Sequence, residues 1–312
     1  MRIQHGFDDT SGYRGGCLSI GNFDGVHCGH QRMLQALVAA ARTAGVPAVA
    51  LTFEPHPINL LAPDRAPPRL TTPEHKAELI AACGVDCLIQ FPTDVALLNL
   101  TAAEFFDQIV RTEINATAII EGPNFCFGRG RAGTIDVLRA FCEQSRIGLT
   151  IVEAVAAEST LVSSSGIRQA IAGGRMADAV AMLGRPYRLT GTVSRGAGRG
   201  VALGFGTANL EQIATLLPAD GVYAGVAEVG GRRYAAAINC GPNPTFGENA
   251  RKIEAHLIGF PGRELYGDRL SVDLIDRVRD TLKFAGVDAL RDQLAEDVRR
   301  SAELARPHLS GC

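Results

Sequence analysis

The sequence has no long apolar run, no basic excess and no apolar segment near its N-terminus, and each absence excludes a class of protein. No run approaches the roughly 18 apolar residues that cross a bilayer, so we expect no membrane span. The formal net charge is −2, whereas a dedicated nucleic-acid binder usually carries a basic excess. Residues 1–16 mix charges without a hydrophobic segment, so they do not resemble a secretory signal. We therefore expect neither a membrane nor a nucleic acid among the partners.

The cysteines are scattered and do not form the pattern of a disulfide framework. Most of them lie inside apolar runs, namely Cys17, Cys83, Cys87, Cys126, Cys142 and Cys240. Buried free thiols in a reducing compartment are the simpler account of this placement. The prediction is a cytoplasmic protein.

The length and the patterning of the first half indicate a separate α/β domain. The 312 residues, 46% of them hydrophobic, suffice for two cores. Short apolar runs alternate with amphipathic segments up to residue 183. The expected strands are 17–20, 46–53, 87–91, 116–121 and 148–155, and the expected helices are 31–44, 73–82, 102–112 and 135–145. This alternation predicts a doubly wound parallel sheet in a domain of residues 1–183.

Two of these helices carry signals in their first turn. Thr72 precedes Pro73, a spelling typical of an N-cap followed by proline at the first helical position. Thr101 and Glu104 have the spacing of a capping box.

After residue 183 the hydrophobic period becomes two. A short helix is expected to end at Gly184, because Pro186 cannot continue it. The expected strands include 222–229, 232–238, 252–260 and 270–275, and the expected closing helix is 288–305. Gly230-Gly231 between the first two strands is a two-residue hairpin signal. These features predict a small antiparallel β-barrel with a C-terminal helix in a domain of residues 184–312.

The first expected strand leads into a glycine-punctuated loop, Gly21-Asn22-Phe23-Asp24-Gly25-Val26-His27-Cys28-Gly29-His30. Glycines permit close approach of the backbone to a ligand, and the helix N-terminus that follows attracts anions. His27 and His30 can add hydrogen-bond donors or positive charge against a phosphoryl group. Because ligands of parallel sheets bind at the carboxyl ends of the strands, we predict a phosphate site here.

Two other accounts of these histidines remain open. They can simply cap or fill the turn. They can also belong to a metal site, since Cys28 lies between them, although no further ligands follow at a usual zinc spacing. Their place between a strand and a helix favours the phosphate site.

The spelling Gly-x-Phe-Asp-Gly-x-His-x-Gly-His resembles the nucleotide-binding signature of the bacterial bifunctional riboflavin kinase/FMN adenylyltransferases, also called FAD synthetases. The resemblance implies that His27 and His30 stabilise the transferring phosphate, and that Asp24 shapes the loop. The nucleotide-binding residues that it implies in this loop are Gly21, Phe23, Asp24, Gly25 and Gly29.

Three further segments resemble motifs of the same adenylyltransferase. They are 52–57, 121–133 and 162–168. The flavin-binding residues implied by two of them are Phe53, Pro55, His56, Pro57, Asn124 and Phe125. The third implies that Ser164, Ser165 and Arg168 reach nucleotide phosphates, with Arg168 steadying the leaving group. The residues alone indicate only a proline-rich turn, a solvated Gly- and Arg-rich loop and a serine-capped helix. The chain departs from the family at Pro123 and Thr134, where acidic residues are usual.

The element Gly204-Phe205-Gly206-Thr207-Ala208-Asn209, with Glu254 further on, resembles the riboflavin kinase module of that family. The resemblance gives Thr207 and Asn209 to the metal-bound nucleotide and makes Glu254 the base that takes the proton of the ribityl hydroxyl. The local sequence pattern alone indicates only that Glu254 is an exposed strand residue. The chain departs from the family at five positions. Val201, Gly206, Asn243, Gly259 and Thr281 stand where the family usually has a basic residue, Pro, Arg, Asp and Glu, respectively. They spare the expected base and metal ligands but remove two positive charges near a polyphosphate.

The resemblance covers residues 17–305 and implies a bifunctional enzyme. ATP would phosphorylate riboflavin to FMN in the second domain, and the first domain would adenylylate FMN to FAD with release of pyrophosphate. It implies ATP, Mg²⁺, FMN and FAD as ligands and small molecules as the only partners. One alternative is an FMN adenylyltransferase whose barrel is a degenerate kinase with a flavin-binding or structural role. Another is a nucleotide-sensing or RNA-associated binding protein, which the near-neutral charge disfavours.

Overall fold

The computed structural model describes residues 1–157, 160–195, 204–243, 248–262 and 264–309. The chain forms two compact units, the first made of Met1–Pro67 and Thr71–Ser163, the second of Pro68–Leu70 and Ser164–Cys312. The second unit therefore includes two helices, α7 (Ser164–Ala172) and α8 (Met176–Leu183), that precede the barrel. The division of function at residue 183 stays a prediction.

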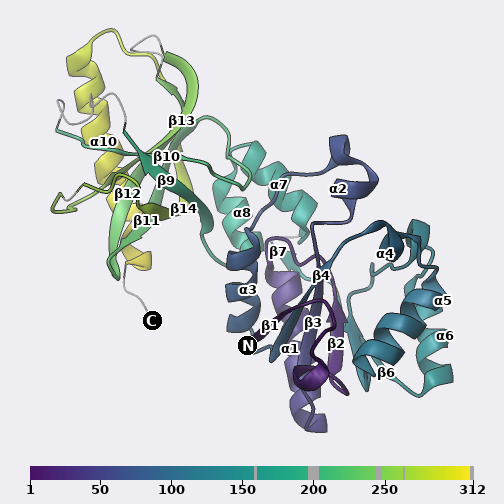
Figure 1. The fold of residues 1–312 in the computed structure, drawn as a ribbon. Coiled ribbons are helices and arrows are strands. Elements are labelled where there is room, and N and C mark those ends of the chain that lie inside the picture. The colour runs from purple at the N-terminus through teal and green to yellow at the C-terminus, as the bar shows by residue number, and fades with distance from the viewer. Residues whose placement is uncertain (158–159, 196–203, 244–247, 263, 310–312) are drawn as a thin grey trace. The chain divides into compact units, whose positions relative to one another are not determined.

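The first unit is built on a six-stranded sheet with the order β1-β4-β3-β2-β5-β6, in which every neighbouring pair is parallel (Figure 1). Its strands are β1 (Arg2–His5), β2 (Cys17–Ile20), β3 (Ala48–Glu54), β4 (Cys87–Pro92), β5 (Ala118–Glu121) and β6 (Gly148–Ile151). The predicted parallel sheet is confirmed. The edge strand β1 was not predicted, because only Gln4 of its four residues is buried and no apolar pattern marks it.

Helices cover both faces of this sheet, because successive residues of a strand point to opposite faces. Cys17 belongs to the core under α1 (Cys28–Ala44) and α3 (Pro73–Ala82). Its neighbour Leu18 belongs to the opposite core. That core is covered by α5 (Ala102–Phe105), a π-helix (Phe106–Ile114) and α6 (Ile135–Ser145). Shorter elements of this unit are α2 (Ile58–Leu61), α4 (Val95–Asn99), β7 (Ala156–Ala157) and β8 (Thr160–Leu161).

Both predicted helix caps are present. The Thr72 hydroxyl accepts the His75 N–H at 3.2 Å, one residue before Pro73. The Thr101 hydroxyl accepts the Glu104 N–H at 3.2 Å, while the Glu104 carboxylate accepts the Thr101 N–H at 2.8 Å. The helix that begins here continues as the π-helix, which sequence patterning did not predict.

The second unit contains a closed antiparallel barrel with the strand order β10-β13-β12-β11-β14-β9. Its strands are β9 (Tyr187–Ser194), β10 (Ala208–Glu211), β11 (Gly221–Val229), β12 (Arg232–Asn243), β13 (Glu248–Leu257) and β14 (Arg269–Arg279). The hairpin at Gly230-Gly231 is confirmed, with φ of 59° and 76°, as a type I′ turn requires. Gly184 ends α8 in the left-handed conformation and donates its N–H to the Val180 carbonyl at 2.8 Å.

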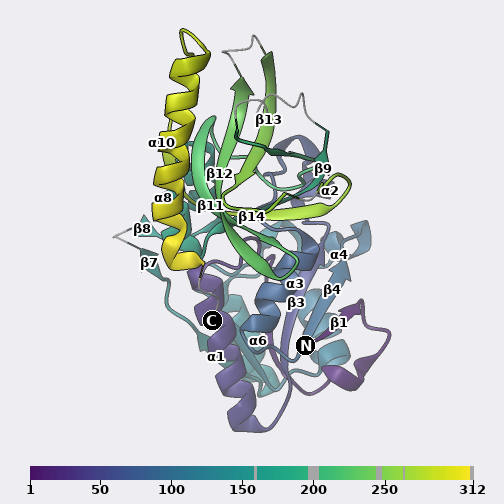
Figure 2. The same ribbon diagram turned by 90° about the vertical axis from the view of Figure 1, so that its left-hand side faces the viewer.

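The closing helix α10 (Val287–Ala305) lies along the barrel against β11, β12 and β14 (Figure 2). Asp297 on its inner side is 2% exposed. Arg279, at the end of β14, donates from Nε and Nη2 to both carboxylate oxygens of Asp297, at 2.9 and 2.7 Å. The Gln293 amide adds a third bond to the same carboxylate at 2.9 Å. This buried ion pair joins the helix to the barrel.

Among the helices of the described residues, none has both the length and the apolar character needed to span a membrane.

We predict that Asp297→Ala lowers the free energy of unfolding by about 3–5 kcal/mol, because removing one partner of a buried pair leaves the other charge uncompensated. Asp297→Asn keeps an oxygen acceptor and should lose less. Urea denaturation followed by circular dichroism measures both. The exposed Asp292 on the same helix supplies the control Asp292→Ala, expected within about 0.5 kcal/mol of the wild type. Equal losses at positions 292 and 297 would contradict the docking role.

Candidate active site

The loop between β2 and α1 has an unusual backbone. Phe23 and Val26 adopt left-handed conformations, with φ of 48° and 38°, although such a conformation costs a non-glycine residue roughly 1–2 kcal/mol. Both side chains are fully buried. Burial of these two side chains therefore holds the loop in a shape that its backbone alone would not adopt.

A hydrogen-bonded pair secures the middle of the loop. The Asp24 carboxylate accepts both the N–H and the hydroxyl of Thr71 at 3.1 Å. The Thr71 hydroxyl in turn accepts the Gly25 N–H at 3.2 Å. This geometry supports the interpretation of Asp24 as a residue that shapes the loop.

A buried lysine lies beneath the start of the loop. Lys76 on α3 is 6% exposed and donates to the Asn22 carbonyl at 3.2 Å and to the Thr52 hydroxyl at 3.4 Å. Its ammonium group is 3.8 Å from the Glu54 carboxylate. Lys76 brings a positive charge to the carboxyl ends of β2 and β3.

His27 caps α1, one of the two alternatives that the sequence left open. Its Nδ1 accepts the His30 N–H at 3.3 Å, so the proton of the neutral ring lies on Nε2, which can donate to a ligand. The two imidazole rings stack with their centroids 3.7 Å apart. Capping and phosphate binding use different nitrogen atoms of His27 and are therefore compatible.

His30 is held in its neutral form. Burial, followed by the charges of His27 and Lys76, lowers the pKa of His30 well below its ordinary value. Its Nδ1 and the Asn22 Oδ1 are both shielded from solvent, and neither has a hydrogen-bond partner among the described residues. Buried polar atoms of this kind mark a place where a ligand can bond.

The expected flavin residues lie at or just after the ends of β3 and β5, the two strands that flank β2, at the same edge of the sheet. Phe53 is the penultimate residue of β3 and packs against the core. His56 accepts the Ile58 N–H at 3.1 Å through Nδ1, between Pro55 and Pro57. After β5, Asn124 is exposed, and Phe125 stacks on Phe127 with ring centroids 5.5 Å apart. The structure thus brings both segments to the edge that carries the histidine loop.

The two departures in the loop after β5 are accommodated. Thr134, in place of an acidic residue, caps α6 by accepting the Val137 N–H at 3.5 Å. Pro123 is exposed. The loop is closed by two backbone bonds between Phe127 and Gly133, at 3.0 and 2.9 Å.

The expected phosphate residues of the third motif lie in the second unit. Ser164 and Ser165 begin α7, and Arg168 follows one turn later. Arg168 donates from Nε to the Pro68 carbonyl at 2.8 Å, within the same unit. Their approach to a nucleotide on the histidine loop stays a prediction.

Register places two of the expected kinase residues, Asn209 and Glu254, in one row across the barrel. Glu254 on β13 lies opposite Asn209 on β10 and opposite Asn239 on β12. The residues on either side of Glu254, Ile253 and Ala255, are buried. The row therefore lies on the outer face of the barrel, with Glu254 at its centre between two amide side chains. Sequence analysis did not include Asn239, because its pairing with Glu254 depends on the register of two distant strands.

Gly206, where the family has proline, is held by another residue. Its carbonyl accepts a hydrogen bond from His256 Nδ1 at 2.8 Å. The edge of the Phe205 ring also meets the His256 ring, with centroids 5.7 Å apart. These contacts restrain the backbone just before Thr207 without the proline.

The other departures divide into described and undescribed positions. Val201 and the side chain of Asn243 lie outside the described residues. Gly259 occupies a turn with φ of 72°. The Thr281 hydroxyl is buried and has no hydrogen-bond partner in the part of the chain that the structure describes.

The oxygen donors of the barrel suit a hard cation. Thr207 and Asn209 offer a hydroxyl and an amide oxygen, and Mg²⁺ typically takes one or two protein ligands together with substrate phosphates and water. The described residues contain no group of three or more His, Cys, Asp and Glu arranged to hold a metal. The residues present thus fit a cation that arrives with its nucleotide.

A buried glutamate was not singled out by sequence analysis. Glu121, the last residue of β5, is 1% exposed, and its Oε1 accepts the Ile20 N–H at 2.6 Å. Burial raises the pKa of Glu121 well above its ordinary value, against the opposing effect of bonds from the Ile20 and Gly122 N–H groups. The signal in the sequence that could have identified Glu121 was an acidic residue directly after the apolar run of β5.

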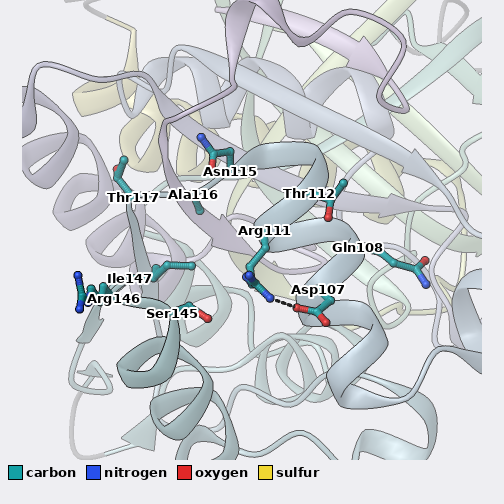
Figure 3. A pocket seen from close by; sticks show the side chains of 10 residues that line it. All are labelled: Asp107, Gln108, Arg111, Thr112, Asn115, Ala116, Thr117, Ser145, Arg146 and Ile147. Atoms are coloured by element: carbon teal, nitrogen blue, oxygen red, sulfur yellow. Dashed lines mark hydrogen bonds and ion pairs between the residues drawn. The ribbon is translucent and has the colours of Figure 1, made fainter.

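A polar hollow of about 630 Å³ lies in the first unit, away from these residues (Figure 3). It is lined by Asp107, Gln108, Arg111, Thr112, Asn115, Ala116, Thr117, Ser145, Arg146 and Ile147. Asn115 is the C-cap of the π-helix and Arg146 is the C-cap of α6, so two helix C-termini lie at this region. Basic side chains there complement the carbonyl ends of the helices, and none of the predicted site residues lines the hollow.

Comparison with known proteins identifies both halves. Residues 10–166 match the family model described as FAD synthetase, and residues 183–305 match that described as riboflavin kinase. A bifunctional riboflavin kinase/FMN adenylyltransferase of Escherichia coli is 34% identical over 284 residues, 90% of each chain. Proteins of the same name from Pseudomonas fluorescens and Bacillus subtilis are each 33% identical, over 98% and 90% of this chain and 99% and 89% of theirs.

A solved structure is similar to this chain over nearly its whole length. The crystal structure described as a macrolide-efflux protein from Streptococcus pneumoniae has a TM-score of 0.85 and 30% identity, and covers 96% of this chain and 99% of its own. The parallel sheet, the closed barrel and the two family matches lead to one conclusion: the chain belongs to the bifunctional riboflavin kinase/FMN adenylyltransferase family.

Proposed function

We propose that this chain makes FAD from riboflavin in two ATP-dependent steps, one in each of its domains. The observation that carries the proposal is the presence of both family domains in one chain. The histidine loop and the flavin segments share the carboxyl edge of the parallel sheet, while Glu254 and Asn209 share a row of the barrel. This favours a bifunctional enzyme over an adenylyltransferase with a degenerate barrel.

In the first step, the terminal ribityl oxygen of riboflavin attacks the γ-phosphorus of ATP. The new O–P bond gives FMN, and the bond to the β-phosphate oxygen breaks to release ADP. Glu254 takes the proton of the hydroxyl as general base. Asn209 and Asn239, which lie opposite it on both neighbouring strands, orient the carboxylate and the phosphates.

In the second step, a phosphate oxygen of FMN attacks the α-phosphorus of ATP, and the bond to the β-phosphate breaks to release pyrophosphate. No covalent enzyme intermediate is needed, so the protein aligns the reactants and stabilises charge. His27 and His30 donate hydrogen bonds to the transferring phosphate from neutral rings. Lys76 and the N-terminus of α1 supply the positive potential, and Arg168 steadies the leaving pyrophosphate.

Mg²⁺ is the cation that the barrel residues would hold, through the Thr207 hydroxyl and the Asn209 amide oxygen. When bound, it screens the negative charge of the nucleotide phosphates. The flavin in the first domain would contact Phe53, Pro55, His56, Pro57, Asn124 and Phe125. A cytoplasmic location and the absence of nucleic-acid and membrane partners remain predictions from composition.

A chromatographic time course with riboflavin, ATP and Mg²⁺ tests the proposal. We expect FMN to appear first and FAD to follow, and we expect EDTA in excess of the metal to stop both, since the phosphates then lack their counter-charge. FAD from FMN but no turnover of riboflavin would establish the degenerate-kinase alternative. No product from either flavin would refute both activities.

We predict that the double variant His27→Ala/His30→Ala loses FAD formation from FMN by at least about 100-fold, the typical cost of removing a transition-state hydrogen-bond donor. Riboflavin phosphorylation by the same sample should be unchanged and serves as the control for folding. His27→Asn keeps a capping oxygen for the His30 N–H but lacks the imidazole donor. Full activity of His27→Asn would reduce His27 to a helix cap.

We predict that Glu254→Gln lowers riboflavin phosphorylation by about 10²–10⁴-fold, because the amide cannot accept the proton. Conversion of supplied FMN to FAD should stay at the wild-type rate. Glu228→Gln, an exposed position on β11, is the matched control and should affect neither reaction. Loss of both activities in Glu254→Gln would mean that the domains are not independent.

A further inference from the structure

Strands β2 and β5 separate at their carboxyl ends, and a side chain bridges them there. Their backbone pairing is formed at Cys17 with Ala118 and at Leu18 with Ile119. Two residues further on, the partner of the Ile20 N–H is the Glu121 carboxylate, at 2.6 Å. Glu121 thus continues the pairing of the two strands with its side chain.

This bridge lies at the topological switch point of the sheet. From β2 the sheet extends through β3 and β4 on one side and through β5 and β6 on the other. Ligands of doubly wound sheets bind outside the strand ends at such a point. Glu121 lies buried beneath that position and does not face solvent, since it is 1% exposed.

Two functional loops leave the strands immediately after the bridge. Gly21, the residue after Ile20, begins the histidine loop, and Gly122 begins the loop that carries Asn124 and Phe125. Glu121 also accepts a hydrogen bond from the Gly122 N–H. One carboxyl group therefore binds Ile20, the residue just before the histidine loop, and Gly122, the first residue of the other loop.

We propose that Glu121 is a positioning residue for adenylyl transfer, whose carboxyl group sets the separation of the histidine loop and the flavin loop by bridging the ends of β2 and β5. The inference rests on the proposed FMN adenylyltransferase activity. Glu121 itself touches no reacting atom. It acts through Ile20 and Gly122 on the residues that do.

The bridge is formed by a buried carboxyl group. Burial raises the pKa of Glu121, and no charged side chain is among the described groups that act on it. A glutamine has the same length and a carbonyl oxygen for the Ile20 N–H, so it should reproduce the bridge. Alanine leaves that buried N–H without an acceptor, which frees the two strand ends to move apart.

The test compares Glu121→Ala, Glu121→Gln and the exposed control Glu143→Ala on α6 of the same unit. Initial rates of FAD formation from FMN and ATP give kcat and KM at a temperature where circular dichroism finds every variant folded. We expect Glu121→Ala to lose roughly 30- to 100-fold in kcat, the effect of a misplacement of about 1 Å. KM should change less than kcat, because each loop keeps its own binding residues.

Rescue and an internal standard distinguish positioning from stability. Glu121→Gln should return kcat to within about 3-fold of the wild type, by retaining the acceptor, and Glu143→Ala should match the wild type. Riboflavin phosphorylation in the same preparations should be equal in all variants. The inference is overturned if folded Glu121→Ala keeps wild-type kcat, or if Glu121→Gln is as impaired as Glu121→Ala. Absence of FAD formation by the wild type would instead refute the proposed function.

Discussion

The first unit depends on one constraint: the backbone that leaves β2 must keep its polar groups paired although the strand ends inside the protein. Buried N–H and C=O groups that lose a sheet partner need another acceptor or donor. Here the partners are side chains of other elements, with Glu121 on the Ile20 N–H, Thr71 on the Gly25 N–H and Lys76 on the Asn22 carbonyl. The shape of the histidine loop therefore belongs to the whole edge of the sheet and not to the loop alone.

The same burial bears on how this loop would contact the phosphate in the proposed reaction. Burial, with the charges of His27 and Lys76, lowers the pKa of His30. In the proposed reaction the histidines would therefore contribute hydrogen bonds, while Lys76 and the start of α1 would supply the positive potential. Separating these roles has a physical advantage. A charged histidine would be costly to bury without a ligand, whereas the Lys76 ammonium is compensated by the Glu54 carboxylate and by neighbouring oxygens.

In the barrel, strand register alone brings the expected kinase residue Glu254 together with Asn209 and Asn239. The Gly230-Gly231 turn sets the pairing of β11 with β12, and β12 then pairs with β13 so that Asn239 faces Glu254. A shift of one residue would turn Glu254 toward the core. His256, two residues along the same face, restrains Gly206, so a single strand supports both the expected base and the loop before Thr207.

Local patterns in the sequence determined the element types, the caps at Thr72 and Thr101, the Gly-Gly hairpin and the histidine loop, because each of these depends on neighbours within a few residues. The predicted sheet and barrel follow from the same periodicities. Edge strand β1 was missed, since it has no apolar pattern of its own. The helix over 102–112 was predicted, but not its π-helical hydrogen bonding, which side-chain periodicity does not reveal. Only the tertiary structure decided the partners of Glu121 and Lys76 and the pairing of Asn239 with Glu254. Those contacts join residues far apart in the chain, and no local pattern encodes which distant group will satisfy a buried polar atom.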